Sequence, residues 1–321
     1  MVRFRRFQNS DPPLLTRLWQ QQMPARGRML GISTAILEGM IFSKTYFDHD
    51  GFWVAEDEGK LVGCAHAWPL PDEMGSAVGG GKAGTTGLLL VLPHAKQEEI
   101  ANELLRQTES YLQRQQCSQI FGGNAAPFDQ FYLGIYGGCI PSGILASDEL
   151  SVRAFEQRGY AEFQRKLLWG RSLEGFRPSI DRVQRNLKND YEVRIEEGLS
   201  PEPSWQPQVW AHVEWNRATL VHRRTDEVVA SFGIWDLEPL AKDAMETTLA
   251  MIYLQDNPQV RTSGMTQYLI AEAMLISQRE HATERVEFCA ADEDVSLQEV
   301  YRKLGMEAYD AGILFRKAAP Q

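Results

Sequence analysis

The two halves of this chain repeat the same order of segments, and this repeat constrains the fold more than any other feature. In each half a strand-like run leads through a proline (Pro93, Pro258) and, three residues later, a cationic residue (Lys96, Arg261) into a helix-like stretch. Both pairs lie 165 positions apart. A later segment also recurs, SDELSVRAFEQRGY in the first half and DVSLQEVYRKLGM in the second, after an insertion of about nineteen residues in the first copy. A repeat of this length predicts two similar domains in tandem.

Length and composition agree with two globular domains. The chain has 321 residues, of which 43% are hydrophobic and 24% charged, as in an ordinary soluble protein. No apolar run reaches the roughly eighteen residues that a membrane span requires, and no signal-peptide core follows the N-terminus. We therefore expect a cytoplasmic protein with no membrane partner. The net charge of −10 argues against nucleic acid as a partner, because phosphate-backbone binding depends on clustered basic side chains.

The cysteines and histidines point to no metal site. Four cysteines and six histidines are scattered along the chain without the close spacing of zinc ligands or of a disulfide framework. Cys64 and Cys289 fall within predicted strands and are interpreted as core residues. His66 and His222 also lie in predicted strands, where a structural role is favoured over a catalytic one.

The periodicity predicts the same elements in each half. The first half is expected to contain strands over 2–7, 85–92 and 119–122, helices over 12–22, 96–114 and 148–158, and a hairpin turning at residues 57–59. The second half is expected to restart with a strand over 190–197, a helix over 209–215 and a hairpin turning at Thr225 and Asp226. The repeat places the first domain at 1–173, a connector at 174–189 and the second domain at 190–321.

The second half contains a candidate anion site. The strand-like METTLAMIYL is followed by Gln255 to Asn257, by PQVRTSGMT, and by the apolar-periodic YLIAEAMLIS. This order places Arg261, a hydroxylic pair and Gly264 where a helix begins. The first backbone N–H groups of a helix lack intrahelical partners and carry the positive end of its dipole, so such a site favours phosphate.

Two motifs carry a resemblance to a known family. The pattern P-x-x-R-x-x-G-x-T, formed by Pro258, Arg261, Gly264 and Thr266, resembles the acyl-CoA cradle of the GNAT superfamily of N-acetyltransferases, Q/R-x-x-G-x-G/A after a strand that ends in Val-x-Pro. Here two extra residues separate the strand from the proline. The segment 294–306 resembles the family's second signature, N-x-x-A-x-x-L-Y-x-K-x-G-F, with an aspartate in the Asn position and Tyr301 in the Tyr position.

The resemblance implies a fold and a cosubstrate. The fold class is α+β, with two tandem GNAT-like domains that each contain a mixed, mostly antiparallel sheet flanked by helices. The cosubstrate is acetyl-CoA, and the acceptor is a small-molecule or peptide amine. The residues implied in binding the thioester and the pyrophosphate are Ile252, Tyr253, Leu254, Arg261, Thr262, Ser263, Gly264, Met265 and Thr266.

The resemblance also implies the catalytic groups. Tyr301 would donate a proton to the leaving thiolate, a role that a phenol within hydrogen-bond reach can fill. Glu246 is the first candidate for the base, and Asp236 and Glu287 are alternatives, while ordered water could also carry the proton away. The implied function is an acyl-CoA-dependent N-acyltransferase. The alternative is a non-catalytic acyl-CoA-binding or interaction protein.

The two copies differ in chemistry. The residue aligned with Gly264 is Glu99, preceded by Glu98, and the residue aligned with Tyr301 is Phe155. Carboxylates at the helix start oppose phosphate, so the first domain is predicted to be degenerate. Its Gly-rich insertion, YLGIYGGCIPSGIL, either forms a wall of the second domain's active site or folds back on its own domain. The sequence leaves the oligomeric state and the identity of the amine open.

Overall fold

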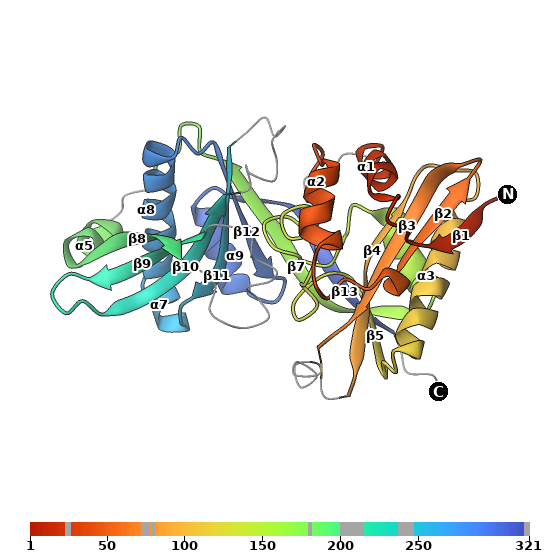
Figure 1. The fold of residues 1–321 in the computed structure, drawn as a ribbon. Coiled ribbons are helices and arrows are strands. Elements are labelled where there is room, and N and C mark those ends of the chain that lie inside the picture. Colours follow the sequence, from red (N-terminus) through yellow and green to blue (C-terminus); the bar gives the residue numbers. More distant parts are fainter. Residues whose placement is uncertain are drawn as a thin grey trace. The chain divides into compact units, whose positions relative to one another are not determined.

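The structure, a computed structural model, divides into two compact units (Figure 1). It describes residues 1–22, 27–71, 78, 81–178, 182–199, 215–236 and 247–317. Unit 1 consists of Met1–Lys166 together with Asp310–Gln321, and unit 2 of Leu167–Tyr309. Each unit contains a mixed sheet with helices against it, which confirms the predicted fold class.

The first five strands of unit 1 pair antiparallel, except for the last two, which are parallel. They are β1 (Arg3–Arg6), β2 (Phe52–Asp57), β3 (Lys60–Pro69), β4 (Ala83–Val91) and β5 (Gln119–Gly122). β1 to β4 pair in chain order and antiparallel, and β4 pairs with β5 in parallel. The predicted hairpin turn lies between β2 and β3, where Glu58 and Gly59 both have positive φ, as a tight type I′ turn requires.

The helices of unit 1 include the three that the sequence predicts and a short one at residues 34–37 that it does not predict. They are α1 (Pro12–Gln20), α2 (Thr34–Leu37), α3 (Gln97–Arg114) and α4 (Glu149–Gln157), with a π-helical turn at Glu38–Phe42 and a 3₁₀ turn at His49–Gly51. α3 is amphipathic and buries Ile100, Leu104 and Leu105 against the sheet. Beneath α3 and α4 lies a core cluster that includes Leu89, Phe155 and Ile313.

Unit 2 repeats this arrangement. Its strands are β8 (Tyr191–Leu199), β9 (Trp215–His222), β10 (Val228–Asp236), β11 (Thr248–Gln255) and β12 (Arg285–Ala291). β8 to β11 pair antiparallel, and β11 pairs with β12 in parallel. Its helices are α5 (Arg182–Asp190), α7 (Pro258–Thr262), α8 (Met265–Glu280) and α9 (Val295–Lys303). The helix predicted over 209–215 lies outside the described residues except for Trp215, which begins β9.

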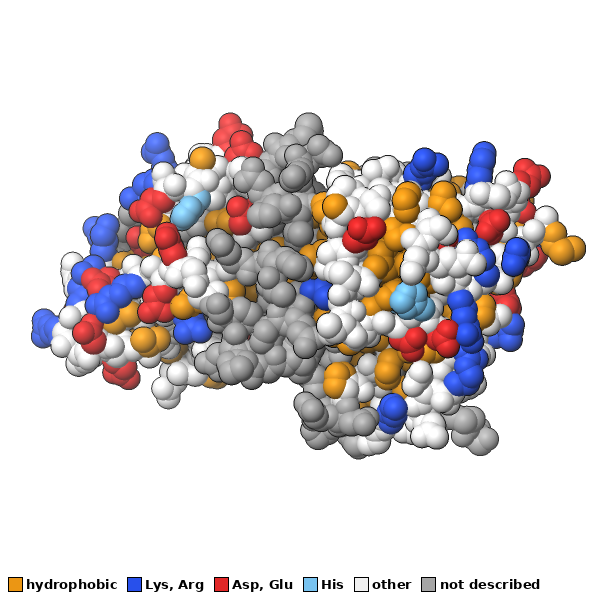
Figure 2. Space-filling view, in the orientation of Figure 1, with side chains coloured by type: hydrophobic (Ala, Val, Ile, Leu, Met, Phe, Trp, Pro, Cys, Tyr) orange, Lys and Arg blue, Asp and Glu red, His pale blue; other side chains and the backbone are white. Residues whose placement is uncertain are grey.

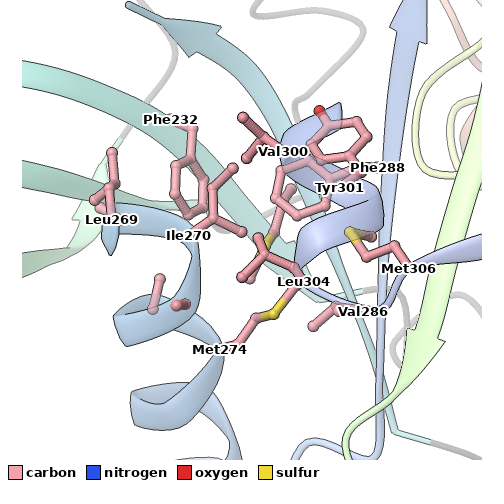
Figure 3. Close-up of a cluster of buried hydrophobic side chains, with 14 of the residues drawn as sticks. Phe232, Leu269, Ile270, Met274, Val286, Phe288, Val300, Tyr301, Leu304 and Met306 are labelled. Carbon is pink, nitrogen blue, oxygen red and sulfur yellow. The ribbon is translucent and has the colours of Figure 1, made fainter. Parts of the chain in front are cut away.

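The core of unit 2 lies between its sheet and helices α8 and α9 (Figure 3). Phe232 from β10, Phe288 from β12, Met274 from α8 and Leu304 at the end of α9 are all buried there. Figure 3 also shows Tyr301 of α9 in this cluster, beside Phe288. Helix α9 is therefore held in place by a tightly packed apolar core.

Two strands pass from one unit to the other. β7 (Tyr160–Ser172) begins in unit 1 and ends in unit 2, where it pairs with β12, whereas β13 (Glu307–Lys317) begins in unit 2 and ends in unit 1. Within unit 1, β13 pairs antiparallel with β5 and with the short β6 (Ile144–Leu145). Gly143, with φ +117, lies so close to the backbone of Ile313 that a Cβ there would collide with it.

These units differ from the division at residues 173 and 190 that the repeat predicts. The repeat records the order of elements in each copy, but the sheet that a strand joins depends on tertiary pairing. The segment predicted as a connector also contains α5, whose Gln184 and Leu187 are buried.

Candidate functional site

The parallel strands of unit 2 share only a short ladder. Thr248, Leu249 and Ala250 pair with Arg285, Val286 and Glu287, and the register ends there. Both strands continue, β11 to Gln255 and β12 to Ala291. The C-terminal half of β11 is therefore not paired with β12 by this register.

A β-bulge against β10 lies in this half of β11. Ser231 of β10 lies opposite Gln255, but Gly233 lies opposite Ile252, so β11 has one residue more than its partner between these pairs. Tyr253 has φ +53 and its side chain is 41% exposed. A bulge turns peptide groups out of the ladder. The sequence predicts the thioester site at Ile252, Tyr253 and Leu254, and the bulge falls within these residues.

Tyr301 lies beside the end of β12 that extends beyond its register with β11. Its ring is 1% exposed and contacts Phe288 and Trp169, with ring centroids 5.0 and 5.7 Å away. Its hydroxyl donates to the carbonyl oxygen of Cys289 at 3.4 Å, and Figure 3 shows this hydroxyl at the edge of the apolar cluster. The hydroxyl is therefore held on β12 just beyond the point where the register with β11 ends.

Two helices form the predicted cradle. Asn257 caps the five-residue α7 by accepting from the N–H of Val260 at 3.0 Å. The N–H groups of Ser263 and Gly264 are bonded within this turn, to the carbonyls of Gln259 and Arg261. α8 then begins after Gly264, whose φ of +82 favours glycine. The first intrahelical bond at this end runs from the N–H of Tyr268 to Gly264, so the amides of residues 265–267 head the helix without intrahelical partners.

Arg261 is bound by two carboxylates. Its Nε donates to Asp256 at 2.8 Å, and its Nη1 donates to Asp294 at 2.7 Å and to the Ser296 hydroxyl at 3.0 Å. The Asp256 carboxylate is 1% exposed and also accepts from Thr266 Oγ1 at 2.7 Å. The hydrogen bonds that Arg261 donates to Asp256, and then to Asp294, raise its pKa above the ordinary value. The predicted phosphate-binding cation is thus already engaged.

Asp294 is held in its charged form. Burial alone would raise its pKa, but the Leu297 N–H, the Ser296 hydroxyl and the Arg261 guanidinium together lower it. Sequence reasoning identified Asp294 as a departure from the family pattern and missed Asp256. The available signal for Asp256 was its place in the two-residue insertion before Pro258.

The other predicted cradle residues have local partners. The hydroxyl of Thr262 donates to Pro258 and that of Ser263 to Val260, so both turn back onto α7. Ile252 is buried, and Leu254 and Met265 are half-buried against the unit 2 core.

The three candidate bases have different surroundings. Glu246 lies outside the described residues. Asp236 is exposed at the end of β10, where it lines a pocket of about 210 Å³ together with Asn216, Ser277, His281 and Thr283. Glu287 is 7% exposed and accepts from Tyr309 at 3.0 Å and from Arg285 at 3.4 Å.

The corresponding region of unit 1 is filled by its own side chains. β4 has a similar bulge near Gly87, but all nine of its residues are buried. Ser151 of α4 donates to the Leu89 carbonyl at 3.1 Å, and Phe155 packs on Gly122. At the head of α3, Glu98 and Glu99 are exposed.

The insertion of unit 1 folds back on its own unit. Phe131, Tyr132 and Tyr136 are each at most 1% exposed. Tyr132 Oη lies 2.8 Å from Nδ1 of His66, and Tyr136 Oη accepts from the Leu145 N–H at 3.1 Å. Burial lowers the pKa of His66 to about 3, so this histidine is neutral at pH 7. Of the two alternatives for the insertion, the one in which it folds back on its own domain describes where these aromatic rings lie.

The described residues contain neither a cluster of metal-ligating side chains nor a helix able to cross a membrane. They contain no cluster of three or more His, Cys, Asp or Glu placed to bind one metal ion. Within the described ranges, no helix combines the length and apolar character that a membrane crossing requires. On the face drawn in Figure 2, acidic and basic side chains are mixed over both units.

Comparison with known proteins identifies the fold. The acetyltransferase (GNAT) family model matches residues 15–127, within unit 1. No curated protein matches the sequence. Among solved structures, a tandem GNAT protein from the clavulanic acid biosynthesis pathway superposes with a TM-score of 0.64 at 13% identity, covering 100% of this chain and 99% of that one. A GCN5-related N-acetyltransferase from Sphaerobacter thermophilus gives 0.62 at 12% identity, covering 100% and 96%.

A third structure is longer than this chain. It is the fungal multi-domain GH3 β-N-acetylglucosaminidase with a GCN5-related glucosamine N-acetyltransferase region, with a TM-score of 0.69 at 14% identity. The match covers 98% of this chain but only 38% of that protein. Identities this low show a shared fold alone. The GNAT family model thus matches the sequence within unit 1, and the fold of tandem GNAT proteins extends over both units.

Proposed function

We propose that this protein is an acyl-CoA-dependent N-acyltransferase that transfers an acetyl group from acetyl-CoA to an amine, with the reaction in unit 2. The observation that carries the proposal is the difference in exposure between the two cradle strands. β11 exposes Tyr253 and Gln255 beyond its register with β12, whereas all nine residues of β4 are buried. A thioester can reach the backbone only where the strand is exposed.

The chemistry needs few protein groups. The amine nitrogen attacks the thioester carbonyl carbon, a C–N bond forms, the C–S bond breaks, and CoA leaves as a thiolate. Backbone N–H groups at the bulge around Tyr253 would stabilise the oxygen as it gains negative charge. Tyr301 would donate its proton to the sulfur. Its present bond to the Cys289 carbonyl is 3.4 Å long, and such a weak bond is readily exchanged.

The amine proton needs an acceptor. We keep Glu246 as the first candidate for the base, with Asp236 and Glu287 as alternatives and ordered water as a further route. Of the two described carboxylates, Asp236 is exposed and Glu287 is bonded to Tyr309. Asp236 is therefore the more accessible alternative.

A second function is favoured by one observation. The two carboxylates on Arg261 remove the free cation that a CoA diphosphate would use. Of the non-catalytic alternatives, an acyl-CoA-binding or an interaction protein, an occupied Arg261 favours the interaction protein, which would retain the fold and the bulge without turnover. The sequence departures at Asp294 and before Pro258 are compatible with this alternative.

Calorimetric titration with acetyl-CoA tests where the cosubstrate binds. We expect one site per chain, abolished in Gly264→Glu because a carboxylate then faces the phosphates. Gly264→Ala is the matched control, since it introduces the same backbone strain without charge and its Cβ would meet atoms at ordinary contact distances of 3.4 and 3.6 Å. Two equal sites, or full binding by Gly264→Glu, would refute the assignment to unit 2.

Release of free CoA thiol separates the two functions. A panel of amines should include glucosamine, because one structurally similar protein region is described as a glucosamine N-acetyltransferase, together with polyamines, amino acids and peptide N-termini. Amine-dependent thiol release supports the enzyme. Tight acetyl-CoA binding without release across the panel supports the binding protein.

A further inference from the structure

The hydrogen bonds of Arg261 leave it little capacity for another ligand. Nε and Nη2 donate to Asp256, and Nη1 donates to Asp294 and to Ser296. A guanidinium has five N–H donors, and these contacts use four of them. The side chain is 19% exposed, so most of the group is also out of reach of solvent.

The charge of this cluster is negative. One guanidinium faces two carboxylates, Asp256 and Asp294, which leaves a formal excess of one negative charge at the head of the cradle. A diphosphate that approaches the α8 amides therefore meets this excess charge. Like charges in a partly buried site repel more strongly than in water.

The two carboxylates differ in how firmly they are held. Asp256 is 1% exposed and is tied to Thr266 as well as to Arg261. Asp294 is 28% exposed and lies on a separate element, as the N-cap of α9. Asp294 is thus the carboxylate that an incoming anion can displace from Arg261, while Asp256 stays in place.

Unit 1 lacks this arrangement. Its equivalent N-cap residue, Asp148, is paired with Arg28 at 3.0 Å, and its cradle cation, Lys96, lies 3.8 Å from Glu99. Two residues before the cradle proline, unit 1 also has Val91 where unit 2 has Asp256. The carboxylate clamp on the cradle cation is therefore particular to unit 2.

We propose that Asp294 determines how tightly unit 2 binds the phosphate groups of its ligand, because a diphosphate must displace it from Arg261. This inference rests on the proposed function, since it takes the phosphate-bearing ligand to be an acyl-CoA. An uncharged residue at position 294 removes the excess negative charge and leaves Arg261 available to the phosphate.

The test measures the affinity of the full-length protein for inorganic pyrophosphate, by calorimetry at fixed ionic strength. Asp294→Asn retains a good N-cap side chain for α9. Loss of one charge at this distance should tighten pyrophosphate binding about five- to tenfold. Asp148→Asn is the matched control in unit 1 and should leave the affinity unchanged. In the double variant Arg261→Gln with Asp294→Asn, the gain should disappear.

Several results would overturn the inference. They are an unchanged or weaker affinity in Asp294→Asn, no measurable binding in that variant, or a gain that persists without Arg261. If Asp294→Asn does not fold, Asp294→Ser offers another N-cap residue for the same comparison. The proposed function is judged separately by amine-dependent thiol release from acetyl-CoA. If the protein releases thiol from acetyl-CoA but Asp294→Asn gains no affinity for pyrophosphate, only the proposed role of Asp294 is refuted. If Asp294→Asn gains affinity but no amine causes thiol release, only the proposed enzymatic function is refuted.

Discussion

At the residue scale, the Tyr301 hydroxyl is the group whose removal is most informative. Tyr301→Phe keeps the buried ring and its contacts with Phe288 and Trp169, and loses only the oxygen near the Cys289 carbonyl. If the phenol protonates the thiolate, kcat should fall by about ten- to ten-thousand-fold while acetyl-CoA affinity changes little. Steady-state kinetics and calorimetry measure the two quantities.

A second phenol in the same unit provides the control for this variant. Tyr268 lies on α8 and is 5% exposed, so Tyr268→Phe also removes a hydroxyl from a buried ring. This variant should leave kcat within about twofold. The loss of a buried hydroxyl that takes no part in the reaction changes the stability of the protein and not the chemical step. An unaltered kcat in Tyr301→Phe, where acyl transfer limits turnover, would assign Tyr301 to packing alone.

At the element scale, the bulge in β11 depends on a backbone conformation that most residues avoid. Tyr253 has φ +53 and an exposed side chain. Tyr253→Val places a β-branched residue there and should lower the free energy of unfolding by about 1–2 kcal/mol, whereas Tyr253→Gly should be nearly neutral. Chemical denaturation of both variants measures the difference. Equal stabilities would mean that the bulge relaxes without strain.

Much of this element was predictable from the sequence, and some of the site was not. The strand, the following helix and Gly264 at its start follow from local periodicity and glycine chemistry, which neighbouring residues determine. The pairing of Arg261 with Asp256 and Asp294 joins residues up to 33 positions apart, and no local pattern specifies it. The burial of β4 in unit 1 also depends on distant contacts, such as the hydrogen bond from Ser151 to the Leu89 carbonyl.

At the scale of the whole molecule, unit 1 depends on a strand from the far end of the sequence. Ile313 of β13 is 3% exposed in the unit 1 core and pairs with Ile144. Ile313→Ala should destabilise unit 1 by about 2–4 kcal/mol through the cavity it leaves. Hydrogen exchange should then show loss of protection in α3 and β5, with α8 less affected.

A core substitution in unit 2 provides the reverse comparison. Met274 of α8 is fully buried in the other core, so Met274→Ala should reduce protection in α8 first and leave α3 less affected. If both variants produce the same pattern, the two units unfold as one cooperative body. Strands β7 and β13, which each belong partly to both units, would then couple the stability of one unit fully to that of the other.

The course of β13 also bears on how the protein is made. A ribosome releases residues 1–166 well before residues 310–317, which complete the unit 1 sheet beside β5 and β6. At about 5–20 residues per second this delay is roughly 7–30 seconds. During that time the nascent first half has an open sheet edge, and such edges invite pairing with other chains. Unit 1 is therefore expected to need chaperone protection during translation, even though it is the half synthesised first.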